Sequence, residues 1–172
     1  MKKKISNVMI FLIALTVHML TEDEWASLEQ SMLGLTEIEV TAKYGMPEKT
    51  GRDELLDSTI AYYRVKEGGG AEQIGEIFYS GGQVAALRRN VRGDGRELLK
   101  SFVSSHSGEI LASGDLHAIA GSSGDCDLYH IIEVTRFGAT VYSANGDLYR
   151  RMAAIGEAPS LPEAHGRKGY AA

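Results

Sequence analysis

Two helix-start signals in close succession constrain the beginning of this chain most strongly. Thr21 and Glu24 form a T-x-x-E capping box, in which each side chain accepts a hydrogen bond from the backbone N–H of the other residue. Thr36 and Glu39 repeat the same arrangement fifteen residues later. We therefore expect the fold to open with two short, individually capped helices.

Each of these helices also has a stop signal. Gly34 follows the first helical segment, and Gly45 follows the second, with Pro47 two residues further on. An isolated helix of about two turns is unstable in water, because helix nucleation is costly. The careful capping therefore predicts that the second helix is held against a sheet and directs the chain into it.

Three strand-like runs follow the predicted helices. They span residues 58–65, 72–80 and 83–91, and they are rich in β-branched and aromatic side chains. Gly81 and Gly82 separate the last two runs, and two glycines between strands indicate a tight hairpin. Residues 21–92 therefore predict an ααβββ domain, with two short helices packed on an antiparallel sheet.

A second α+β segment is expected over residues 93–156. A helix over 94–106 would place Leu98, Leu99, Phe102 and Val103 on one face. Strand candidates follow at 108–114, 115–121 and 127–134. Asn145-Gly146 indicates a type I′ hairpin turn, and residues 157–172 are expected to form a flexible tail. The chain as a whole is predicted to be α+β.

The first twenty residues have the pattern of a secretory signal peptide. Lys2, Lys3 and Lys4 precede an apolar run from Val8 to Leu20 that is short for a membrane span. An uncleaved N-terminal anchor is the alternative, and it is the only membrane contact we expect. Removal of 1–20 would change the formal net charge from -5 to -8. This acidity argues against a nucleic-acid partner, and we predict a periplasmic or secreted protein.

The string G-L-T-x-x-E-V-x-x-x-Y-G-M-P, followed by "IAYYRV" and "IFYSGGQV", resembles the SmpA/OmlA type of domain, found in the small lipoprotein of the bacterial β-barrel assembly machine. The matching positions are Gly34, Leu35, Thr36, Glu39, Val40, Gly45 and Pro47. The resemblance covers residues 22–91. The β-lactamase inhibitory protein, with tandem domains of similar ααβ architecture, is a structural relative. The resemblance implies an extracytoplasmic binding or scaffolding module of the cell envelope.

No catalytic, cofactor or metal site is predicted from the sequence. The chain has no G-x-S-x-G elbow and no P-loop, and Cys126 is its only cysteine, so it can form no internal disulfide. His106, His117 and His130 lack the paired spacing of zinc ligands. The alternative function is a small secreted hydrolase or metal-dependent enzyme that uses these histidines. Their convergence with an acid in one cleft would indicate it.

A protein interface is expected on the sheet. Two helices cover one face of a three-stranded sheet, and an antiparallel sheet can leave its other face to solvent. Tyr62, Tyr63, Arg64 and Arg88 are the candidate contact residues, since tyrosine and arginine are common in binding hot spots. Alternation allows either Tyr62 with Arg64 or Ala61 with Tyr63 to face outward. The expected partner is another envelope or secreted protein, unless the second half folds over this face and buries it.

Overall fold

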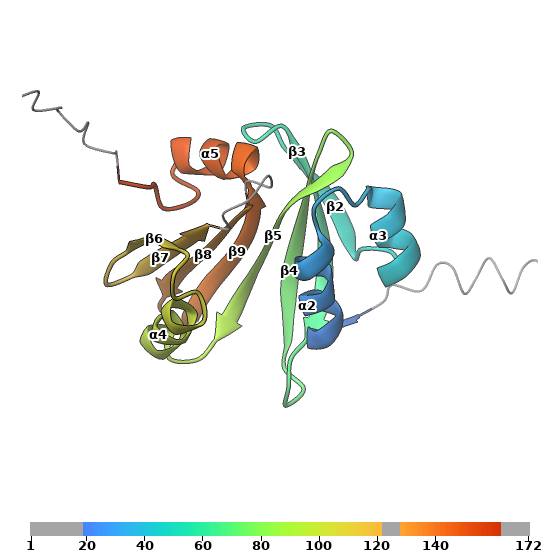
Figure 1. Cartoon of the computed structure of the whole chain (residues 1–172). Helices are drawn as coiled ribbons and strands as arrows, with labels where there is room; N and C mark the ends of the chain where they lie inside the picture. Colours follow the sequence, from blue (N-terminus) through green and yellow to red (C-terminus); the bar gives the residue numbers. More distant parts are fainter. Residues whose placement is uncertain (1–18, 122–127, 163–172) are drawn as a thin grey trace, which may run out of the picture.

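The computed structural model describes residues 19–121 and 128–162 (Figure 1). The strands in these ranges are β1 (Leu20–Thr21), β2 (Lys49–Asp53), β3 (Ser58–Lys66), β4 (Glu72–Ser80), β5 (Gln83–Arg92), β6 (Ile110–Ser113), β7 (His117–Gly121), β8 (Leu128–Thr135) and β9 (Gly138–Asn145). The helices are α2 (Glu22–Ser31), α3 (Glu37–Tyr44), α4 (Gly95–Ser105) and α5 (Gly146–Ala154).

All of these strands belong to one sheet, in the order β1-β3-β4-β5-β9-β8-β7-β6, with β2 on the outer side of β3. The α+β class is as predicted, but the three-stranded antiparallel sheet expected for the first half is part of a much larger sheet. Strands β5 and β9 pair antiparallel, from Ala86 opposite Ala144 to Arg92 opposite Gly138. The two halves of the chain therefore share a single sheet. The pairing of β1 with β3 is parallel, so the sheet is mixed.

The capping boxes form as the sequence predicts. Thr21 and Thr36 are the N-caps of α2 and α3, and each accepts a bond from the N–H of a glutamate that in turn accepts from the threonine's own N–H. Gly45 ends α3 with φ of 83°, a conformation that strains any residue with a Cβ, and its N–H donates to the carbonyl of Thr41. Helix α3 then buries Val40 and Tyr44 against the sheet.

Strand register shows which helices share a face. One row of side chains runs across five neighbouring strands, through Ile77, Leu87, Ser143, His130 and Ala120. Helices α2 and α3 pack over the Ile77 end of this row, and α4 packs over the Ala120 end. These three helices therefore cover the same side of the sheet, called here the helix face. The opposite side is called the open face.

Helix α5 lies against one end of the open face (Figure 1). Its Leu148 and Met152 pack with Ile60, Phe78 and Ala86 of the first half. The second half therefore covers this face only in part.

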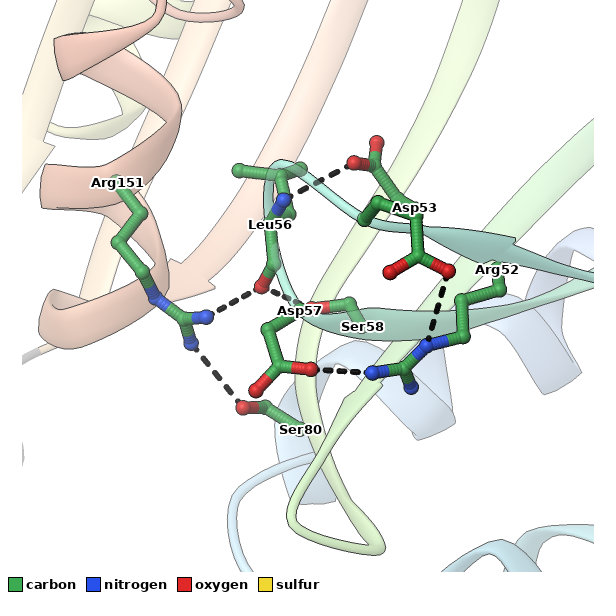
Figure 2. A network of polar contacts seen from close by, with 8 residues as sticks. Arg52, Asp53, Leu56, Asp57, Ser58, Ser80 and Arg151 are labelled. Atoms are coloured by element: carbon green, nitrogen blue, oxygen red, sulfur yellow. Dashed lines mark hydrogen bonds and ion pairs between the residues drawn. The ribbon is translucent and has the colours of Figure 1, made fainter.

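An arginine connects α5 to the turn between β2 and β3 and to the end of β4 (Figure 2). The guanidinium of Arg151 donates to the carbonyl oxygen of Leu56, and its Nη2 donates to Ser80 Oγ at 3.1 Å. Leu56 belongs to the turn between β2 and β3, where its N–H donates to Asp53 Oδ1 at 3.0 Å. This network fixes α5 across the boundary between the halves.

Three boundaries differ from the sequence expectations. Asn145 is the N-cap of α5 and accepts from the N–H of Leu148, so Asn145-Gly146 is not a hairpin turn. The expected tail is ordered at its start, because Ala158 is buried and the carbonyl of Pro159 accepts from Tyr149. Leu20 is buried and pairs with Val65, so the folded body includes the last residue of the expected signal segment. Residues 1–18 and 163–172 lie outside the described part.

Candidate functional site

The part of the open face beyond α5 carries polar and aromatic side chains in register. One row contains Tyr62, Glu76, Arg88, Tyr142 and Ile131, on β3, β4, β5, β9 and β8. Register places Arg64, Ile74, Asn90, Thr140 and Glu133 in the next row, further from α5. Ile131 and Tyr142 are buried in the cluster that includes α5, so the accessible surface of this face consists of the other side chains of the two rows.

Ion pairs hold the arginine at the centre of this face. Arg88 is paired with Glu76 on β4 and with Glu157 after α5, at 3.1 Å between Nη1 and Oε2 in the second pair. Its guanidinium also lies 5.0 Å from the centre of the Phe78 ring. Burial alone would lower the pKa of Arg88, but the hydrogen bond and charge of Glu76 outweigh it and raise the pKa. Arg88 is therefore a fixed positive charge in a prearranged position.

A groove of about 790 Å³ lies at the end of the open face away from α5. Arg64 lies on one side, where its Nε and Nη2 donate to the two carboxylate oxygens of Glu48 at 3.0 and 2.8 Å. Phe137, in the turn between β8 and β9, is 75% exposed, and Ile74 on β4 is 44% exposed. Both line the groove, so it combines exposed apolar surface with a preoriented guanidinium.

The structure separates the four predicted contact residues. Tyr62, Arg64 and Arg88 lie on the open face, but Tyr63 belongs to the helix face. Tyr63 is 1% exposed, packs in the core with α2 and α3, and donates its hydroxyl hydrogen to the carbonyl of Gly45 at 3.0 Å. Tyr63 as a contact residue is therefore a wrong prediction, and the outward pair is Tyr62 with Arg64.

The helix face has an unexpected polar region at its middle. Helices α2 and α4 pack on separate apolar clusters, and between them lie Ser143 of β9 and His130 of β8. A cleft of about 440 Å³ opens over these two residues. Its walls include Glu29 of α2 and His106, which follows α4. Polar side chains at the centre of a sheet are costly to bury unless they are hydrogen-bonded.

Hydrogen bonds join the polar side chains of this cleft. His130 Nδ1 and Ser143 Oγ are 2.9 Å apart, and Ser143 Oγ is 3.5 Å from Glu29 Oε1. Burial raises the pKa of Glu29, while the charge of Arg89 and the bond to Ser143 oppose this shift. Burial and the nearby His106 lower the pKa of His130, and the charge of Glu109 opposes that shift. Both shifts favour the neutral form of their group.

Two of the three candidate histidines converge in this cleft. The rings of His106 and His130 are 5.3 Å apart, centre to centre. His117 pairs with Glu133 and lies on the open face, away from the other two. Cys126 lies outside the described residues. Within the described ranges, no three His, Cys, Asp or Glu side chains are grouped closely enough to hold a metal ion.

Among the described residues, Ser143 carries the hydroxyl in the lining of this cleft, and its surroundings bear on whether it could act as a nucleophile. Ser143 is in a central strand and is 2% exposed. Strand β9, which carries Ser143, is paired with β5 on one side and with β8 on the other. The backbone amides around Ser143 are therefore used in the hydrogen bonds of the sheet. Acyl transfer needs hydrogen-bond donors aimed at a developing oxyanion. The backbone groups at Ser143 that the ladders use are not available for this role.

Sequence reasoning missed Glu29 and Ser143 as members of this cleft. Both are polar residues in otherwise ordinary segments, and neither belongs to a motif. The local signal for this cleft is His130. It alternates with Leu128 and Ile132 along a strand, so all three side chains share one face of the sheet.

Comparison with known proteins adds little to this picture. Neither the protein-family models nor the curated proteins include a match to the chain. Among solved structures, an extracellular protein containing an SCP domain from Bacillus anthracis str. Ames is similar, with 13% sequence identity and a TM-score of 0.45. The match covers 72% of this chain and 47% of that protein, so the chain spans about half its length. This likeness is too weak to indicate a shared function. None of the helices in residues 19–121 and 128–162 has the length and apolar character needed to cross a bilayer.

Proposed function

We propose that this chain is an exported, non-catalytic module that binds another envelope or secreted protein through the open face of its sheet. The observation that carries the proposal is the groove beside Arg64, where Phe137 and Ile74 are exposed next to the preoriented guanidinium of Arg64. Exposed aromatic and arginine side chains on a rigid scaffold are typical of interface hot spots.

Two sequence features support the location and class of this function. The lysine-rich start and apolar run of residues 1–20 support export. The resemblance of residues 22–91 to the SmpA/OmlA type of domain supports a binding or scaffolding role at the cell envelope. Fractionation and N-terminal sequencing of the expressed protein test the export part. A cytoplasmic product that still begins at Met1 would contradict it.

The binding part is tested by capture of partners from envelope extract with purified protein, followed by mass spectrometry. Arg64→Glu reverses a charge in the groove, and Ile74→Glu replaces an exposed apolar side chain with a charged one. Each should abolish capture of a specific partner. Ile38→Glu on α3 is the matched control, since Ile38 is 81% exposed on the other side of the molecule. Equal capture by all variants, with unchanged melting of each, would reject the open face as the interface.

A small hydrolase is the second candidate, because His106, His130 and Glu29 converge in one cleft. The backbone around Ser143 is paired with β5 and β8, so it does not supply donors for an oxyanion, which argues against a hydrolase. Hydrolysis of ester or peptide substrates by wild-type protein, lost in Ser143→Ala, would support this candidate over the first.

A further inference from the structure

The cleft between α2 and α4 has the construction of a small-molecule site. Its volume of about 440 Å³ lies in the range of ligand pockets, roughly 300–1,000 Å³. Phe102, Leu128 and Val141 supply apolar walls, and a few polar side chains converge at its floor and rim. It also lies where the two halves of the chain meet, which is a common place for ligand sites.

The hydrogen bonds of His106 fix which of its ring nitrogens is available. His106 Nδ1 is 2.9 Å from the carbonyl oxygen of Phe102. A carbonyl oxygen only accepts, so Nδ1 carries the proton in this contact. In the neutral ring, Nε2 is then an acceptor, and it has no partner among the described residues. The His106 ring is also held in place by the Phe102 ring, 4.3 Å away between centres.

The hydrogen bonds that link Glu29, Ser143 and His130 also leave an acceptor nitrogen on the His130 ring. Burial favours neutral Glu29, but the charge of Arg89 and a bound ammonium both favour its ionised form. Ser143 has one hydroxyl proton, and the ionised carboxylate accepts it. Ser143 Oγ then accepts from Nδ1–H of His130, at 2.9 Å. His130 Nε2 is left with a lone pair. In this arrangement the cleft presents three acceptors and no donor from these side chains.

The charges around the cleft favour a cation. Helix α2 brings the carboxylates of Glu22 and Glu29 to the same side of the sheet as Arg89, whose Nη1 is 3.9 Å from Glu22 Oε1. Glu109 acts on His130 from beyond α4. Burial and the nearby His106 lower the pKa of His130, which favours the neutral form of its ring. Among the described residues that line the cleft, Glu29 is an acid and none is an Arg or Lys.

We propose that the cleft between α2 and α4 binds a small organic cation, a primary amine on an apolar body. The ammonium group donates to Glu29 and to Nε2 of His106 and His130, and the apolar body contacts Phe102, Leu128 and Val141. This site is separate from the open face, so the ligand and a protein partner bind to opposite sides of the sheet.

Titration with 2-phenylethylamine tests the proposal, with 3-phenylpropanoate and 2-phenylethanol as probes of the same body but different head group. NMR of the imidazole signals near pH 7.5 reports binding. We expect saturable shifts of His106 and His130 with the amine, no shift of His117, and much weaker effects of the acid and the alcohol. Equal shifts with all three probes, or no saturable shift at millimolar amine, would overturn the proposal.

Glu29→Gln should weaken amine binding roughly tenfold or more, because it removes a charge-assisted hydrogen bond. Asp23→Asn is the matched control, since it removes the same charge from the exposed side of α2. Equal weakening in both variants would mean that the overall negative charge of the protein attracts the amine without a specific contact to Glu29. That outcome would reject the site. If Glu29→Gln fails to fold, the comparison of the three probes on wild-type protein still decides.

Discussion

The indole of Trp25 lies directly over Gly75, so close that a Cβ on Gly75 would be 2.3 Å from a ring carbon. Trp25 is fully buried and anchors α2 to β4. The absence of a side chain at position 75 is therefore what allows this helix to sit on the sheet.

We predict that Gly75→Val destabilises the protein by more than about 3 kcal/mol, because the indole must leave its place in the core. Denaturant melts measure the change. Gly68→Ala is the control, since its new Cβ would have its nearest neighbour, a flexible Glu22 carboxylate, at 3.6 Å. Comparable melting of wild-type protein and Gly75→Val would show that α2 is not held by this contact.

The caps of α3 give a second prediction. Thr36→Ala removes the acceptor for the N–H of Glu39 and should cost roughly 0.5–2 kcal/mol of unfolding free energy. Gly45→Val should cost more, because φ of 83° with extended ψ strains a β-branched residue. Melts of the two variants test both statements. If neither midpoint shifts, the capping interpretation of residues 34–50 is wrong.

The Arg151 network leads to a third prediction. Arg151→Gln removes two charge-assisted hydrogen bonds, to the carbonyl of Leu56 and to Ser80, and leaves the hydroxyl of Ser58 as the donor to Leu56. We expect a loss of about 1–3 kcal/mol and faster amide exchange in α5. Lys100→Gln, which breaks an exposed pair with Glu97 on α4, should have almost no effect. An unchanged exchange rate in α5 would mean that apolar packing alone holds this helix.

A fourth prediction concerns pH. Because the pKa of His130 is lowered in the folded state, the unfolded chain binds this proton at higher pH than the folded protein does. Stability should therefore fall as the pH drops below about 6.5. Glu29 works in the opposite direction: its raised pKa favours folding as the pH falls toward its unfolded value. The groups that face His130 are His106 after α4, Glu109, and Ser143 with Glu29.

The His130 effect is isolated in a Glu29→Gln background. Melts at about pH 7.5 and about pH 5.5 should show a loss of stability that shrinks when His130→Gln is added. His117→Gln, which removes an imidazole from the open face, should leave that loss in place. The same pH dependence with and without His130 would contradict the assignment.

Local features of the fold were predictable because their causes are local. The capping boxes depend on side chains three residues apart, and Thr36 and Glu39 form theirs as expected. The hairpin at Gly81-Gly82 also forms, with positive φ at both glycines, as a type I′ turn requires. Alternation allowed two choices at Tyr62 and Tyr63, and burial beneath α3 decides between them.

Features that depend on distant residues were not predictable. Asn145 has the same local chemistry in a turn and in a helix cap, and it caps α5 because the helix that follows buries Leu148 and Met152. Nothing in the sequence marks β5 and β9 as neighbours. Without that pairing, Glu29 and His130 cannot be placed in the same cleft, since they lie on different halves of the chain.

The pairing of β5 with β9 has a consequence for any attempt to divide the protein. A cut after Gly93 would leave Ala86–Arg92 and Gly138–Ala144 as two bare sheet edges, each the complement of the other. Bare edges recruit new strands, so each piece alone should self-associate. When the two fragments are mixed, β5 and β9 should pair again and restore the original sheet. The fragments could therefore be used as a fragment-complementation reporter.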